Sequence, residues 1–127
     1  MKNRYYETHD GHQFWYLNDE LHREDGPAII YSDGSQGWYI NGKCHREDGP
    51  AYIHEDGTQE WWVNGKLHRE DGPAIIWSDG INQWHVNGKN ITPEVNQWFK
   101  EYNLTYDTME FEDKMALKFF IRGLATD

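Results

Sequence analysis

The sequence predicts a mainly β fold, in which tandem β-hairpin repeats of 23 residues form an antiparallel meander sheet. A C-terminal two-helix cap makes the fold α+β overall. Three observations predict it. The octet LHREDGPA or CHREDGPA occurs three times, and each copy is followed by one further Asp-Gly pair and one Asn-Gly pair. The pattern stops near residue 89, where helical spacing begins. A fixed period of this length is typical of stacked supersecondary units.

The repeat units are residues 21–43, 44–66 and 67–89, and a degenerate unit at residues 1–20 precedes them. The degenerate unit keeps the Asp-Gly pair, the Trp and the Asn at the offsets of the later units: Asp10, Gly11, Trp15 and Asn18 match Asp33, Gly34, Trp38 and Asn41. We therefore divide the chain into a β-repeat array, residues 1–89, and a helical cap, residues 90–127.

The segments between turns are short and rich in Ile, Val, Trp and Tyr, which is typical of strands. Asp-Gly and Asn-Gly are strong hairpin signals. Two strands per unit give about eight strands in all, joined as a simple antiparallel meander.

Turn length decides which side chains share a face. A three-residue loop with left-handed Gly at Asp33-Gly34 pairs Ala28 with Trp38, and the same geometry at Asn41-Gly42 pairs Trp38 with Cys44. Two-residue turns would split the unchanging apolar residues between faces. We therefore expect one core face to collect these residues and their copies: Ala28, Ile30, Trp38, Leu21, Ala51, Ile53, Trp61, Cys44, Ala74, Ile76, Trp84 and Leu67.

The opposite face holds positions that differ between units: Ile29, Tyr52 and Ile75; Tyr31, His54 and Trp77; Tyr39, Trp62 and His85. Repeat proteins commonly vary the side that recognises something. We therefore predict a partner-binding aromatic face formed by Tyr31, Tyr39, His54, Trp62, Trp77 and His85. The alternative is that this face packs under the C-terminal segment.

The charged octet favours a structural turn over chemistry. Equivalent residues two strands apart lie about 9.6 Å from each other, whereas zinc ligands lie within about 2.3 Å of the metal. His22, His45 and His68 are therefore not expected to share an ion, and we expect no metal, cofactor or catalytic residue. Gly26 is expected to take a positive φ and Pro27 to direct the next strand. Asp25 is expected to accept turn backbone bonds, and Arg23 to pair with a carboxylate of its own or the next octet.

Composition restricts the partners and the location. The net charge of -10 argues against a nucleic-acid or anionic-membrane partner and permits a basic protein partner. The single cysteine, Cys44, excludes an intramolecular disulfide and is expected to behave as a small buried hydrophobe. The N-terminal stretch lacks the apolar region of a signal peptide, and no segment approaches the ~20 apolar residues of a membrane span. These features predict a cytoplasmic protein.

Residues 90–127 predict two helices. Thr92-Pro93-Glu94 is a helix start with a capping hydroxyl, and Val95, Trp98, Phe99 and Tyr102 form one helical stripe. Asn103 suits the end of this helix, Asp107 and Glu110 suit a second start, and Gly123 suits a stop. We expect the helices to cap the last repeat and cover part of the core face. The alternative is that Phe119 and Phe120 contact a partner or a second copy, which leaves a homodimer open.

The segment GPAIIYSDGSQGWYINGK, residues 26–43, resembles the MORN-repeat variant of bacterial and phage proteins. In that variant a Gly-Pro element, an aromatic residue before Asp-Gly, a Trp and an Asn-Gly-Lys turn recur. The HREDGPA spelling is similar to a subgroup met in phages and large viruses. The resemblance implies a binding or scaffolding module without its own chemistry, and some relatives are antitoxins. It also implies a phage-encoded inhibitor of a host defence or host enzyme, acting in the host cytoplasm.

The sequence thus favours a non-catalytic protein-binding module, with two alternatives. A nucleotide or small-molecule sponge would stack bases on Tyr31, Trp62 and Trp77 and hold phosphates with Lys43 or Lys66. An acidic DNA mimic would spread the charge of -10 over the eight strands. At ~4.8 Å per strand this is roughly one charge per 4 Å, less than half the density of duplex DNA.

Overall fold

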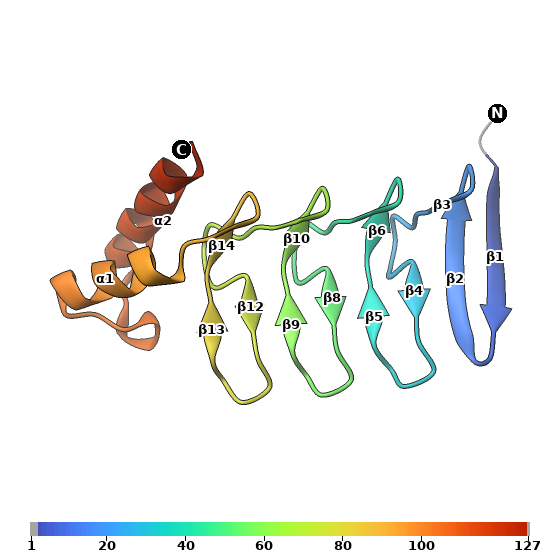
Figure 1. Cartoon of the computed structure of the whole chain (residues 1–127), viewed down its shortest axis with the longest axis horizontal. Coiled ribbons are helices and arrows are strands. Elements are labelled where there is room, and N and C mark those ends of the chain that lie inside the picture. Colours follow the sequence, from blue (N-terminus) through green and yellow to red (C-terminus); the bar gives the residue numbers. More distant parts are fainter. Residues whose placement is uncertain (1–2, 127) are drawn as a thin grey trace.

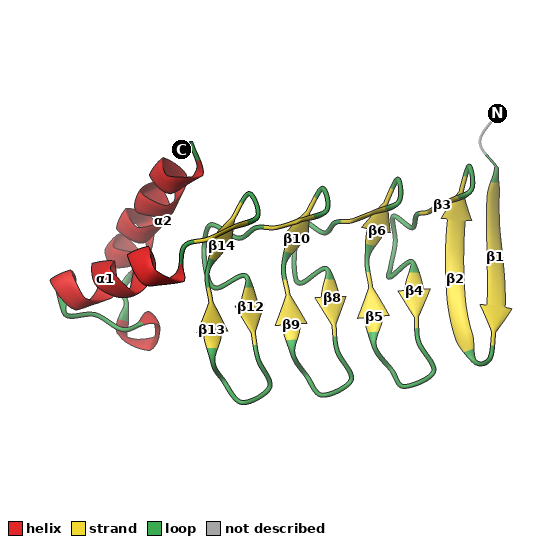
Figure 2. Cartoon of the chain, viewed as in Figure 1, coloured by secondary structure: helices red, strands yellow, loops and turns green. Residues whose placement is uncertain are grey.

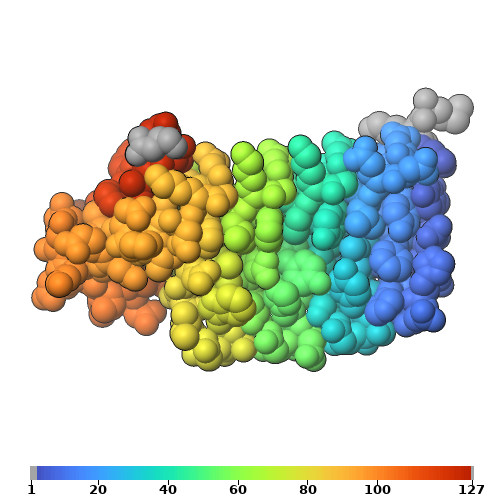
Figure 3. Space-filling view, viewed as in Figure 1, coloured from blue at the N-terminus to red at the C-terminus, as the bar shows by residue number. Residues whose placement is uncertain are grey.

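The structure, a computed structural model, describes residues 3–126. Residues 1 and 2 of the predicted array and residue 127 of the predicted cap lie outside the described residues. Figure 1 shows an elongated row of units that begins with a long hairpin and ends in two helices. In the space-filling view the units form successive bands along the long axis (Figure 3).

Among the residues that the structure describes, the array contains fifteen strands. The first unit contributes β1 (Arg4–His9), β2 (His12–Leu17) and β3 (Glu20–Leu21). The second contributes β4 (Ile29–Ile30), β5 (Gln36–Gly37), β6 (Tyr39–Ile40) and β7 (Lys43–Cys44). The third contributes β8 (Tyr52–Ile53), β9 (Gln59–Glu60), β10 (Trp62–Val63) and β11 (Lys66–Leu67). The fourth contributes β12 (Ile75–Ile76), β13 (Asn82–Gln83), β14 (His85–Val86) and β15 (Lys89–Asn90).

These strands form the predicted antiparallel meander. One open sheet of nine strands runs in the order β1-β2-β4-β5-β8-β9-β12-β13, with β3 paired to β2. The Asp-Gly hairpins make up this sheet, whereas the Asn-Gly hairpins form separate pairs at the opposite edge of the molecule (Figure 2). The strands outnumber the predicted eight because the chain leaves the large sheet at Trp38, Trp61 and Trp84. Trp38 N–H donates to the Ala51 carbonyl of the next unit, and its own carbonyl accepts from His45 N–H.

The two turns differ in length. The three-residue loop at Asp33-Gly34 is confirmed: Tyr31 N–H donates to the Ser35 carbonyl, and Gly34 has a φ of 97°. The prediction for Asn41-Gly42 is wrong, because both residues have positive φ and form a two-residue turn, the type that matches strand twist.

This shorter turn moves one set of residues to the other face. Leu21, Cys44 and Leu67 pair with Tyr16, Tyr39 and Trp62 rather than with the tryptophans predicted. Directly paired residues share a face. The expected core face therefore loses these three residues to the aromatic side.

Each octet folds around its arginine. The Arg46 guanidinium lies over the Trp38 ring, 4.1 Å from its centroid, and bonds both the Asp48 carboxylate and the Pro50 carbonyl. Arg23 and Arg69 repeat this arrangement over Trp15 and Trp61. The arginine therefore pairs within its own octet, and the aspartate accepts from it rather than from the turn backbone. Octets, instead of helices, cover Trp15, Trp38 and Trp61.

The octet glycine is needed for space. Gly26, Gly49 and Gly72 are not among the positive-φ residues, so the expectation of a left-handed glycine there is wrong. A Cβ at Gly49 would lie 3.1 Å from the guanidinium carbon of Arg46. Only glycine lets the arginine side chain fold back onto its own loop.

Side-chain acceptors hold successive turns together. Nδ1 of His22 accepts the Asn41 N–H, and the later units repeat the bond between His45 and Asn64 and between His68 and Asn87. On the Asp-Gly side, the Ser35 hydroxyl accepts the Glu55 N–H of the next unit, and Thr58 accepts the Ser78 N–H in the same way. The equivalent residue of the last unit is Ile81.

The cap contains α1 (Thr92–Tyr102), the 3-10 turn η1 (Tyr106–Thr108) and α2 (Phe111–Ala125). Asn103 ends α1 in the left-handed conformation, as expected. Glu110 precedes α2, and its N–H donates to the Asp113 carboxylate. Gly123 does not stop α2, which continues two residues further to Ala125.

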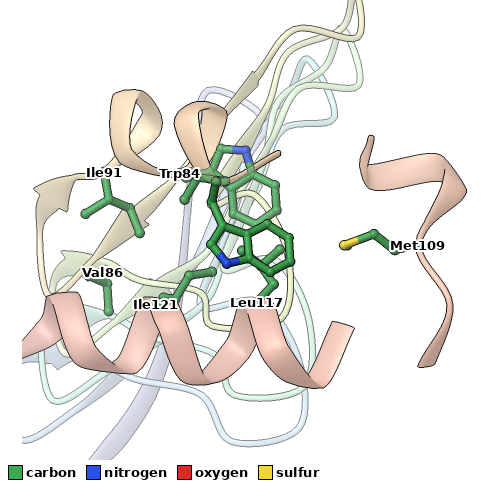
Figure 4. Close-up of a cluster of buried hydrophobic side chains, with 8 residues drawn as sticks. Trp84, Val86, Ile91, Met109, Leu117 and Ile121 are labelled. Carbon is green, nitrogen blue, oxygen red and sulfur yellow. The ribbon is translucent and has the colours of Figure 1, made fainter. Parts of the chain in front are cut away.

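The helices bury the end of the array rather than the face of the sheet. Buried residues of the cap and of the end of the array form one hydrophobic cluster (Figure 4). Its members are Trp84, Val86, Ile91, Val95, Trp98, Met109, Leu117 and Ile121. The Arg122 guanidinium of α2 bonds Glu70 of the third octet. The expectation that the helices cap the last repeat is therefore correct, but they do not spread along the core face.

The cap supplies the contacts that a following unit would make. Phe99 and Tyr106 lie edge-on to the Trp84 ring, where the earlier tryptophans carry an arginine. The Thr92 hydroxyl accepts the backbone N–H of Trp84 at 2.9 Å. The equivalent backbone N–H of Trp38 donates to the carbonyl of Ala51 in the next unit. Thr92 thus completes the array, whereas the predicted capping bond of its hydroxyl to the helix is absent from the described part of the chain.

Candidate binding site

One row of side chains crosses the whole sheet on the aromatic side. The register joins in one line Glu7, Phe14, Ile29, Gly37, Tyr52, Glu60, Ile75 and Gln83. The neighbouring row on the octet side alternates amides with isoleucines, from Gln13 and Ile30 to Ile76 and Asn82. The two faces therefore have different chemistry.

Aromatic rings gather on the first of these faces. Tyr52 lies between Tyr31 and His54, with ring centroids 6.4 and 4.7 Å away. His12 lies edge-on to Tyr31, and Phe14 stacks on Tyr16. We call this surface the aromatic strip and define it as Phe14, Tyr16, Tyr31, Tyr39, Tyr52, His54 and Trp62, all of which are half-buried.

The structure brings together four of the six predicted binding residues: Tyr31, Tyr39, His54 and Trp62 belong to the strip. Trp77 lies beyond it at the last Asp-Gly turn, where its side chain is 42% exposed. His85 is buried, so it is not available to a partner. Neither ring nitrogen of His85 has a hydrogen-bond partner among the described residues, and burial lowers its pKa.

A groove of about 440 Å³ opens in the strip between the second and third units, lined chiefly by Tyr39, Cys44, Tyr52, His54, Glu60 and Trp62. The Glu60 carboxylate is held by two donors at once. Its Oε1 accepts the Trp62 indole N–H at 2.8 Å, and its Oε2 bonds Nε2 of His54. The groove therefore combines several rings with one fixed carboxylate.

Sequence reasoning missed Tyr52 and Glu60 as site residues. Tyr52 occupies a changeable position, and so does Glu60, whose equivalents are Gly37 and Gln83. Variation between units marks both positions, but the expected surface was defined by aromatic positions, and Glu60 is not one of them.

The thiol in the groove is not activated. Burial, and to a lesser extent the negative charge of Glu60, raise the pKa of Cys44 to about 12. Burial also raises the pKa of Tyr39 and that of Tyr52. A nucleophilic cysteine needs the opposite shift, because the thiolate is the reactive form. The groove thus suits binding better than thiol chemistry.

The grooves on the octet side are larger, at about 850 and 620 Å³, and lie between consecutive octets. Their charged groups already bond one another, as Arg46 does with Asp48 and Arg23 with Asp25. His22, His45 and His68 each bond a separate Asn-Gly turn and the Glu of their own octet. Between residues 3 and 126, no group of three or more His, Cys, Asp or Glu side chains could hold a metal ion.

A second exposed apolar surface lies on α2. Phe111, Met115 and Phe119 follow one another at a spacing of four residues, and Phe119 is 64% exposed. Phe120 is not part of it, because its ring stacks on Trp98 inside the cap. Of the two residues predicted as partner or dimer contacts, Phe119 is exposed and Phe120 is half-buried.

No family model matches the chain, and no curated protein or solved structure matches it either. The resemblance to MORN repeats stays a prediction carried by the sequence motifs. Neither helix among the described residues has the length and apolar character needed to cross a membrane.

Proposed function

We propose that the protein is a non-catalytic protein-binding module, located in the cytoplasm, that binds its partner through the aromatic strip. The observation that carries this proposal is the contrast between the two faces. On the octet side, charged groups and tryptophans bond one another within the scaffold. On the aromatic side, half-buried rings and the Glu60 carboxylate line an open groove. Aromatic residues are enriched where protein interfaces are buried.

The variation between units supports the same choice. The HREDGPA residues of the octet are identical in the three units. On the aromatic side, in contrast, one position holds Tyr39, Trp62 or His85 and another holds Tyr31, His54 or Trp77. A surface that changes while the scaffold stays constant is typical of recognition by repeat proteins.

The nucleotide-sponge alternative fits the groove less well. A volume of about 440 Å³ suits a small ligand. However, Lys43 is the one lysine or arginine among the described residues that line it, and Glu60 would repel a phosphate. The inhibition of a host enzyme or defence, and the DNA-mimic alternative, remain predictions from the resemblance and the charge.

Affinity capture tests the proposal. The immobilised protein and a Trp62→Ala/Trp77→Ala variant are incubated with bacterial lysate, and bound proteins are quantified by mass spectrometry. A Met115→Ala/Phe119→Ala variant is the matched control, because it removes exposed apolar side chains of α2. We expect proteins captured by the wild type and by the control variant to be absent from the material bound to the Trp62→Ala/Trp77→Ala variant. Equal capture by all three, with folding verified by circular dichroism, contradicts the proposal.

A further inference from the structure

Glu60 has an unusual position for a carboxylate. It ends β9 with its side chain only 19% exposed, among rings from three different hairpins. Enclosing a charged group is costly unless it is paired. The indole N–H of Trp62 and the imidazole of His54 supply that pairing, one to each oxygen. The carboxylate is therefore held in one orientation inside the groove.

The scaffold does not require this carboxylate. The equivalent positions hold Gly37 in the preceding unit and Gln83 in the following one, and both units adopt the same hairpin register. Because the same register forms with glycine, glutamate or glutamine at this position, the pairing of the strands does not depend on the charge of Glu60.

The rings leave room beside it. A Cβ at Gly37 would lie 2.9 Å from the Tyr39 ring and 3.2 Å from the Tyr52 ring, so the missing side chain lets these two rings approach the groove. The faces of Tyr and Trp rings attract cations. The groove thus presents negative ring faces next to a negative carboxylate.

On the octet side of the same molecule, an aromatic ring and a carboxylate together bind a guanidinium group. There a Trp ring and an Asp carboxylate bind one guanidinium: Arg46 lies 4.1 Å from the Trp38 centroid and 3.1 Å from Asp48. The groove has the ring and the carboxylate, but none of its described lining residues is an arginine. A planar guanidinium both stacks on rings and bonds a carboxylate, which an ammonium group does less well.

We propose that the groove binds the guanidinium of an arginine in a basic segment of the partner protein, stacked on the rings and bonded to Glu60. This inference rests on the proposed function and names the chemistry of its partner. The net charge of -10 favours the approach of such a basic segment.

The test uses blocked peptides of sequence Gly-Gly-Arg-Gly-Gly, with citrulline replacing arginine in the matched peptide. Citrulline keeps the shape of the side chain and lacks its charge. Binding is followed by the NMR signal of the Trp62 indole N–H, identified with a Trp62→Phe variant. We expect the arginine peptide to shift this signal with millimolar affinity and the citrulline peptide to bind at least about tenfold more weakly.

Variants locate the site. Glu60→Gln places the residue of the next unit at this position and is expected to weaken the arginine peptide about tenfold. Glu55→Gln removes an exposed charge from the neighbouring turn and should leave binding unchanged. Equal binding of the two peptides to the wild type, or no shift at about 10 mM peptide, overturns the inference without any variant.

The two proposals fail differently. Capture of a partner that depends on Trp62 and Trp77 but persists in Glu60→Gln overturns the arginine site and leaves the protein-binding function intact. Loss of the partner in both variants, together with the preference for arginine over citrulline, supports both proposals.

Discussion

The arginine of each octet accounts for the residues around it. Its guanidinium covers the Trp of the preceding unit, its Nε bonds the Asp two residues later, and its Nη1 bonds the Pro carbonyl. The glycine between Asp and Pro leaves room for the folded-back side chain. Four of the octet's residues thus serve one contact between units, which explains why these four are the same in all three octets.

A double-mutant cycle tests this account. At Gly72 an added Cβ would lie 2.5 Å from the guanidinium carbon of Arg69. We expect Gly72→Ala and Arg69→Ala each to lower the free energy of unfolding by about 1–3 kcal/mol in urea titrations. Together they should cost about 1 kcal/mol less than the sum, because the alanine no longer meets an arginine.

Gly57→Ala is the control for this cycle. Gly57 has a φ of 93° and no neighbouring atoms within 4 Å, so its cost comes from the backbone alone. It should add to Arg69→Ala without coupling. Additivity of Gly72→Ala and Arg69→Ala would mean that the glycine is there for another reason.

At the scale of elements, the helical cap takes the place of a fifth unit. Rings of Phe99 and Tyr106 stand where an octet arginine would lie, and Thr92 supplies the acceptor that the next strand would supply. The Trp84 N–H is enclosed by this cap, so losing its acceptor leaves a buried donor unpaired.

Thr92→Val tests this role, because it keeps the shape of the side chain and removes the hydroxyl. We expect the free energy of unfolding to fall by about 1–3 kcal/mol, measured by urea denaturation. Thr92→Ser keeps the hydroxyl and should cost clearly less. If both substitutions cost the same, the hydroxyl bond to Trp84 contributes nothing.

At the scale of the whole molecule, neighbouring units touch through contacts that repeat. The Trp-to-Ala backbone bond and the hydroxyl-to-turn bond recur from unit to unit, as do the arginine contacts. An array held together in this way should tolerate the loss of one internal unit.

Deletion of residues 44–66 tests this modularity. The join should bring Arg69 onto Trp38 and the Ser78 N–H onto Ser35, as in the present units. We expect a folded chain with one unfolding transition and an m-value lower by about a fifth. The same deletion removes Tyr52, His54, Glu60 and Trp62, so capture through the strip should be lost. A deleted chain that lacks the circular dichroism signal of folded protein contradicts the modular account.

The sequence predicted the antiparallel meander and both helices because turn pairs and helical stripes are local signals. The sequence predicted a three-residue loop at Asn41-Gly42 because that length places the unchanging apolar residues on one face. The loop has two residues, and Asn41 and Gly42 both have positive φ. The contact of Arg46 with Trp38 joins residues eight positions apart on opposite sides of an Asn-Gly turn, which no local pattern reveals. Four residues of the aromatic strip, Tyr31, Tyr39, His54 and Trp62, were predicted from the variation between units, whereas Glu60 was found only from the three-dimensional groove.

Ile81 has a consequence for the length of the array. In the two preceding units this position carries Ser35 or Thr58, whose hydroxyl anchors the following turn. Ile81 has no hydroxyl, and its side chain is 60% exposed at the end of the row. An additional copy of a unit could be accommodated between existing ones, where each junction has its anchor. A unit placed after the last one would find no hydroxyl at Ile81 to accept the N–H of its turn. The absence of this hydroxyl thus disfavours an extension of the array at this end.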